Sequence, residues 1–206
     1  MPLHVPQPPA PALDCVRAAL TTPALTQGCR VPPAVRAAGA ALRCETPLPV
    51  HVLDRVDRPA DRRRTRLLGW RFLLRAEHTV GAAEARVTDD GWTFSHFCDG
   101  PYVVSTERAL TQAETLPGTY RPRLLSVPAL YMLMLWLHRT PAVGPARTAG
   151  DDGVARALLG QPAAADLLVP LSPAPPGVTA HQPYPADQLL PRLARHLAAP
   201  ALATPA

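Results

Sequence analysis

The short segment Ser95-His96-Phe97-Cys98-Asp99 brings a nucleophile, a base and an acid close together in the chain. A cysteine hydrolase needs a thiol within hydrogen-bond reach of an imidazole, and a third group that orients the ring. Residues two apart on a strand share a face, so His96 and Cys98 could approach each other. They are therefore the candidate catalytic residues of this chain.

The same residues are of the types that bind metal ions, and Asp99 and His181 could complete a ligand set with His96 and Cys98. The histidines are scattered, however, and no two of them have the spacing of a metal site. The cysteines also lack a Cys-x-x-Cys pair: they are Cys15, Cys29, Cys44 and Cys98. We therefore predict no metal site and no cofactor.

The register of the strands around His96 decides which way its side chain points. Alternating apolar and polar residues predict strands over 70–76, 83–87 and 92–98. Asp90-Gly91, between the last two of these strands, is a strong signal for a two-residue hairpin loop.

A loop at that position pairs Ala85 with His96 and Ala83 with Cys98. This register puts the imidazole and the thiol on the same face as Trp92, which we expect to be the core face. A cysteine in apolar surroundings has a raised pKa and is inert. We therefore interpret His96 and Cys98 as structural residues, with catalysis as the weaker alternative.

The rest of the pattern predicts two helices and two more strands. Apolar residues at three- and four-residue spacing predict helices over 103–116 and 186–199. Residues 123–137 fit either a helix or a buried strand, and we favour a strand over 129–137 that pairs with one over 167–171. The predicted fold class is α+β: an antiparallel sheet of about five strands, in the order strand-strand-strand-helix-strand-strand-helix, with the helices packed on one face.

Four segments divide the chain by composition. Residues 1–53 are Pro/Ala-rich and are predicted to be partly disordered. Short helices are possible near 12–20 and 33–43. Alternatively, the start codon was assigned too far upstream, and part of this segment is not translated. Residues 54–66 form an Arg-rich linker. Residues 67–199 form the α+β domain, and 200–206 form a disordered tail.

Composition points to a bacterium with a GC-rich genome, because the chain has no Lys, Asn or Ile but 35 alanines and 27 prolines. A Schiff-base lysine and a P-loop lysine are thereby excluded. The N-terminus lacks the basic and apolar regions of a signal peptide, and the longest apolar run, Val127–Leu137, is shorter than the ~20 residues of a membrane span. We therefore expect a cytoplasmic protein that does not enter a membrane.

A basic segment over 55–75 is the strongest lead toward a ligand. It carries eight of the 21 Lys and Arg residues against two aspartates, so its charge of +6 exceeds the +5 of the whole chain. Such a segment could bind the phosphates of a nucleic acid, although no nucleic-acid-binding motif accompanies it, and a solvated linker explains it equally well. The candidate binding residues are Arg62, Arg63, Arg64 and Arg66.

A second candidate binding site lies where the strand over 92–98 turns into the next helix. Gly100 could present backbone amides to an anion there. Side chains that could line the same end of the sheet are Tyr102, Tyr120, Arg121 and Arg123.

The function that these observations favour is a non-enzymatic binding or accessory module that engages a protein partner. A nucleic-acid-associated protein that uses Arg55–Arg75 is the first alternative. A cysteine-dependent enzyme that uses Cys98 and His96 is the second.

Overall fold

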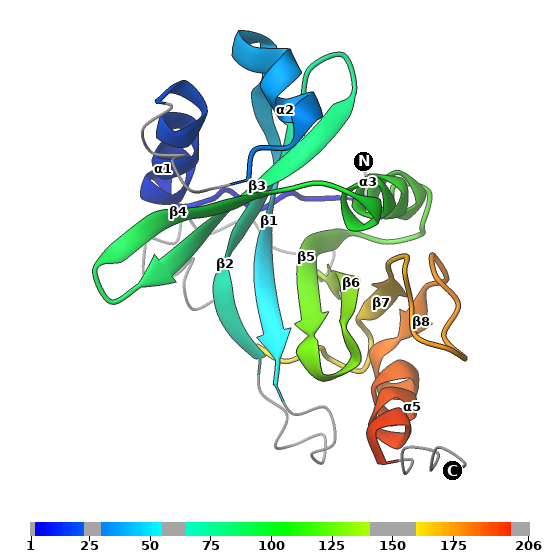
Figure 1. Cartoon of the computed structure of the whole chain (residues 1–206). Coiled ribbons are helices and arrows are strands. Elements are labelled where there is room, and N and C mark those ends of the chain that lie inside the picture. The colour runs from blue at the N-terminus through cyan, green and yellow to red at the C-terminus, as the bar shows by residue number, and fades with distance from the viewer. Residues whose placement is uncertain (1–2, 23–29, 55–64, 141–159, 199–206) are drawn as a thin grey trace, which may run out of the picture.

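The computed structural model describes residues 3–22, 30–54, 65–140 and 160–198 (Figure 1). Within these residues, eight strands form one sheet in the order β4-β3-β2-β1-β5-β6-β7-β8. The strands are β1 (Arg43–Leu53), β2 (Thr65–Arg75), β3 (Thr79–Thr88), β4 (Gly91–Cys98), β5 (Tyr120–Val127), β6 (Met132–Arg139), β7 (Leu167–Pro170) and β8 (Tyr184–Pro185). The helices are α1 (Ala10–Thr21), α2 (Pro33–Ala38), α3 (Pro101–Ala113) and α5 (Ala186–Ala198), with 3-10 turns η2 (Gly39–Ala41) and η4 (Pro128–Leu130).

The sheet is mixed, because β1 and β5 run parallel while the other neighbouring strands run antiparallel. The predicted antiparallel sheet of about five strands is therefore wrong. The largest omission is β1, an 11-residue strand in the middle of the sheet. It lies within the segment that the sequence predicts to be a Pro/Ala-rich tail.

Two prolines explain why the sequence does not predict β1. Pro47 and Pro49 have no N–H to donate to a neighbouring strand, and proline in a central strand is found mainly at bulges. The pairing of β1 with β2 indeed shifts between Glu45 and Leu48, and Thr46 has a φ of 44°. The strand thus accommodates Pro47 in a local irregularity and continues beyond it.

The segment 123–137, predicted to contain one strand, instead contributes to two. β5 and β6 pair antiparallel over Tyr120–Arg139 and are joined by η4, after which Tyr131 adopts a left-handed conformation with φ 49° and ψ 37°. The turn cannot be recognised in the sequence because its residues, Pro128-Ala129-Leu130, are apolar like the strands on either side.

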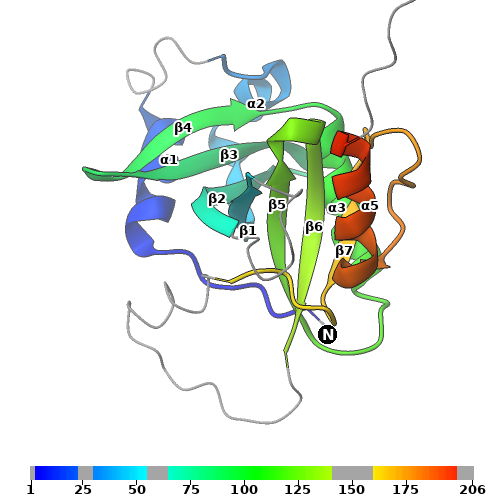
Figure 2. The ribbon, with the colours of Figure 1, turned by 90° about the horizontal axis from the view of Figure 1, so that it is seen from below.

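Helices cover both faces of the sheet, which corrects the prediction that they pack on one face. α1 packs on Trp70, Phe72 and Leu74, and α5 packs on Met134 and Trp136 of the same face, at the opposite end of the sheet (Figure 2). α3 packs on the other face: its Val103 and Leu110 share a cluster of buried residues with Leu73, Leu124 and Leu135.

The two N-terminal helices each begin with proline in the first turn, a position where the missing N–H costs nothing. α1 buries Ala12, Val16 and Ala19, which recur at four and three residues and so form one stripe. No helix in the described ranges is long and apolar enough to cross a membrane.

Candidate metal centre

The β3–β4 hairpin turns one residue earlier than its sequence predicts. Thr88 pairs with Gly91, so the two-residue loop is Asp89-Asp90 rather than Asp90-Gly91. Gly91 has a φ of 107°, and the Thr88 hydroxyl donates to its carbonyl at 2.9 Å. This change alone moves the register by two residues and leaves every side chain on its predicted face.

A β-bulge at Ser95 then reverses the faces. Ala85 pairs with Phe94, but the next pair along the hairpin is Glu84 with His96, so Ser95 is an extra residue on β4. A single inserted residue sends the side chains that follow it to the opposite face. The predicted pairing, and with it the burial of His96 and Cys98 beside Trp92, is therefore wrong.

Phe94 and Phe97 contact the cluster under α1, whereas Cys98 contacts the cluster under α3. The bulge thus separates the aromatic residues of β4 from the two residues that could do chemistry. The imidazole of His96 is 45% exposed, and the thiol of Cys98 is half-buried.

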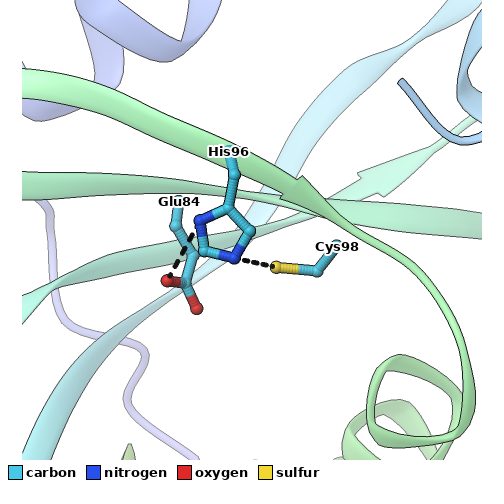
Figure 3. A group of neighbouring side chains, drawn as sticks. All are labelled: Glu84, His96 and Cys98. Carbon is cyan, nitrogen blue, oxygen red and sulfur yellow. Dashed lines mark hydrogen bonds and ion pairs between the residues drawn. The ribbon is translucent and has the colours of Figure 1, made fainter. Parts of the chain in front are cut away.

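Glu84, His96 and Cys98 form one cluster on this face (Figure 3). The Cys98 Sγ lies 3.4 Å from His96 Nε2, and Glu84 Oε2 lies 3.9 Å from His96 Nδ1. One ligand atom from each residue can be chosen so that all three lie within 4.8 Å of one another. The Ser95 hydroxyl is also 3.0 Å from His96 Nδ1.

Arg71 on β2 fixes the carboxylate of this cluster. Its Nε and Nη2 donate to Glu84 Oε1 at 2.9 and 2.6 Å, and the two side chains are only 12% and 10% exposed. The second oxygen, Oε2, is left facing His96. The ion pair therefore orients Glu84 so that one oxygen is available to a further ligand.

The surroundings of Cys98 disfavour the thiolate, which is the reactive form of its side chain. Burial raises the pKa of this thiol to about 11; Arg71 has a smaller lowering effect, and Glu84 a smaller raising effect. Because the thiolate and not the thiol attacks, the raised pKa argues against a cysteine hydrolase built on His96 and Cys98.

A divalent cation changes that balance, since a coordinating thiol is deprotonated by the metal itself. Thiolate, imidazole and carboxylate are the donors that Zn²⁺ accepts, and its bonds of about 2.0–2.3 Å put tetrahedral ligand atoms roughly 3.5 Å apart. The 3.4 Å between Cys98 Sγ and His96 Nε2 already matches. One ion binds one ring nitrogen, so Glu84 Oε2, which lies 3.9 Å from Nδ1, has to move toward Nε2 to complete the set.

The other residues that the sequence suggests as metal ligands lie outside this cluster. His181 is hydrogen-bonded at 3.2 Å to Ser105 on α3, and Asp99 is exposed beyond the end of β4. Glu84 is the residue that the sequence analysis missed. The sequence offered one signal for Glu84: it is the lone acidic residue among alanines in an alternating strand. That it lies beside His96 follows only once the bulge is known.

The basic segment is described only in part, because Arg62, Arg63 and Arg64 lie outside the described residues. Arg66 is exposed and 3.9 Å from Asp54. Arg71 is paired with Glu84, and Arg75 pairs with two carboxylates, at 2.9 Å to Glu45 and 2.8 Å to Glu107. These three arginines thus already have acidic neighbours.

The four residues of the second candidate binding site do not come together. Tyr102 and Tyr120 pack in the cluster beneath α3, where the Tyr102 hydroxyl donates to the Tyr131 carbonyl at 2.7 Å. Arg123 lies on the opposite face, 4.7 Å above the Trp136 ring, and Arg121 shares that face. Comparison with protein-family models, with curated proteins and with solved structures found no match to this chain.

Proposed function

We propose that the protein is a non-enzymatic accessory protein that binds a divalent transition-metal ion, with Zn²⁺ as the best fit, through Glu84, His96 and Cys98. The observation that carries the proposal is the convergence of these three donor types, from two strands, within 4.8 Å. A single hairpin with one bulge supplies all three ligands.

Three protein ligands leave one position of a tetrahedral site open. The His96 imidazole is 45% exposed, so water or a side chain from a protein partner can reach the site, and a protein is the class of partner that we propose. The location that suits such a site is the cytoplasm, where thiols stay reduced. Cys15, Cys44 and Cys98, the cysteines in the described ranges, are all free thiols.

Binding of nucleic acid has less support. The described arginines of the basic segment are paired with carboxylates, so phosphates would have to displace Glu45, Glu84 or Glu107. The largely buried pair of Arg71 with Glu84 is the hardest of these to displace.

Substitution of Cys98 by serine tests the proposal. We expect the full chain to bind Zn²⁺ with a dissociation constant of ~1 μM or below, equivalent to about 8 kcal/mol. Cys98→Ser removes the thiolate ligand and should weaken binding at least about 100-fold. Competition with a chromophoric chelator measures the affinity, and Co²⁺ in place of Zn²⁺ reports a thiolate ligand through its charge-transfer band.

Cys44→Ser is the matched control. Cys44 is also half-buried, and burial likewise raises its pKa to about 11, but it packs in the cluster beneath α1. The control should bind Zn²⁺ and Co²⁺ like the unmodified protein. Equal affinity in Cys98→Ser and Cys44→Ser, or a Co²⁺ complex without a thiolate band, would rule out the proposed site.

A further inference from the structure

A cavity of about 340 Å³ opens between α1 and α2, over the β3–β4 side of the sheet (Figure 1). The two helices make few contacts with each other, because α1 packs on β3 and β4 while α2 packs on β3. The space between them lies near the lower end of the range for small-molecule sites, which is about 300–1,000 Å³. Its size therefore suits a small ligand.

The walls of this cavity are apolar side chains from α1, α2, β4 and the segments that flank α2. Three of them, Ala19, Val35 and Phe97, belong to the buried cluster beneath α1. The other three, Leu20, Val31 and Leu42, pack against the same cluster but are only half-buried. The half-buried side chains leave apolar surface in contact with water, and a hydrocarbon chain that covered this surface would be stabilised by its removal from water.

Arg36 of α2 is the charged residue at the cavity in the part of the chain that the structure describes. Its side chain is exposed, and its Nη2 donates to the carbonyl of Val31 at 3.4 Å. This contact keeps the guanidinium beside a residue of the apolar wall. Arg36 forms no ion pair with a carboxylate of the described ranges, and a guanidinium has further N–H donors for a ligand.

We propose that this cavity binds a medium-chain alkyl carboxylate, with the chain between α1 and α2 and the carboxylate on Arg36. A guanidinium fits a carboxylate through two parallel N–H groups. A carboxylate carries one negative charge, which a single arginine neutralises. A phosphate monoester carries about −1.5 to −2 at neutral pH and would keep part of its charge unpaired.

This site is separate from the proposed metal centre. Phe97 lies between His96 and Cys98 in the chain, but its side chain is on the α1 face of the sheet and theirs are on the other face. A ligand between α1 and α2 therefore leaves the metal ligands free.

Titration of the full chain with sodium octanoate, followed by ¹H–¹³C NMR of the methyl groups, tests the proposal. We expect a dissociation constant of ~1 mM or below, with the largest changes at the methyl groups of Leu20, Val31 and Leu42. Octanoate should bind roughly tenfold more tightly than hexanoate, because two more methylene groups leave water.

Arg36→Gln separates the charged end of the ligand from its chain. This variant should bind octanoate about fivefold more weakly than the unmodified protein and should bind 1-octanol equally well. Arg195→Gln is the matched control, because Arg195 is also an exposed arginine on a helix but lies on α5, at the other end of the sheet. It should bind octanoate like the unmodified protein.

Three results would overturn the proposal. The first is the absence of any octanoate response at these methyl groups, which would mean that part of the chain, such as the segment 23–29 between the two helices, occupies the cavity. The second is equal octanoate affinity in Arg36→Gln and Arg195→Gln. The third is 1-octanol binding as tight as octanoate binding, which would make the site one for a neutral apolar group. Cys98→Ser should bind octanoate normally, so failure of the metal site would leave this test intact.

Discussion

The Gly69→Ala variant is expected to lose at least about 3 kcal/mol of its free energy of unfolding. Gly69 lies in β2 between Val50 of β1 and Arg86 of β3. A Cβ at this position would overlap the carbonyl oxygen of Ala85, a backbone atom that cannot rotate away. Relief of the overlap requires β2 and β3 to separate, and these strands carry Arg71 and Glu84. Urea denaturation followed by circular dichroism measures the loss.

Gly160→Ala is the matched control for this substitution. In the part of the chain that the structure describes, a Cβ at Gly160 meets nothing within 4 Å, and the φ of Gly160 does not lie in the left-handed region. Its stability should therefore stay within about 0.5 kcal/mol of the unmodified protein. Similar stability for Gly69→Ala would mean that β2 and β3 are not as close as the structure places them.

His51 should make the protein sensitive to mild acid. It is 1% exposed on β1, neither ring nitrogen has a hydrogen-bond partner among the described residues, and its ring packs edge-on against Trp136 at 5.3 Å. Burial, reinforced by the positive charge of Arg123, lowers its pKa to about 3. The unfolded chain takes up this proton near pH 6.5, so falling pH favours unfolding throughout the window between the two values. From pH 7.5 to pH 5, His51 should cost about 2 kcal/mol of stability.

The test compares the free energy of unfolding at pH 7.5 and pH 5 in His51→Leu, which keeps the volume of the side chain but does not titrate. This variant should lose about 2 kcal/mol less over that interval than the unmodified protein. His78→Leu, at an exposed histidine between β2 and β3, should keep the original dependence on pH. If His51→Leu and His78→Leu respond alike, His51 is not buried in its neutral form.

The elements that the sequence predicts well are those with a long and regular apolar period. The helix predicted over 186–199 is α5, with Leu189, Leu190 and Leu193 on its buried stripe. The helix predicted over 103–116 is α3, which begins two residues earlier at Pro101. In both helices, apolar side chains three and four residues apart contact one surface, so the helix can be predicted from its own sequence without knowledge of distant residues.

The sheet could not be predicted to the same degree because its irregular strands depend on their neighbours. β1 has two prolines and a positive φ at Thr46, which only pairing with β2 and β5 makes tolerable. The parallel β1–β5 pair joins residues more than 70 positions apart, with no local signal for its direction. Pairing between residues so far apart in the chain cannot be recognised from a short stretch of sequence.

The candidate site was half predictable. The proximity of His96 and Cys98 follows from their spacing of two on a strand, and the structure places them 3.4 Å apart. The face on which they lie, and the presence of Glu84 beside them, depend on one bulge at Ser95. No residue type in the sequence predicts that bulge. A single inserted residue therefore moves His96 and Cys98 from the predicted face beside Trp92 to the face of Glu84.

X-ray absorption at the zinc edge of the Zn²⁺-loaded full chain tests the account most directly. The predicted shell has one sulfur at about 2.3 Å, from Cys98, and nitrogen or oxygen neighbours at about 2.0–2.2 Å, from His96, Glu84 and the open position. A shell of oxygen and nitrogen alone, or one with two or more sulfurs, would show that these three side chains do not bind the ion together.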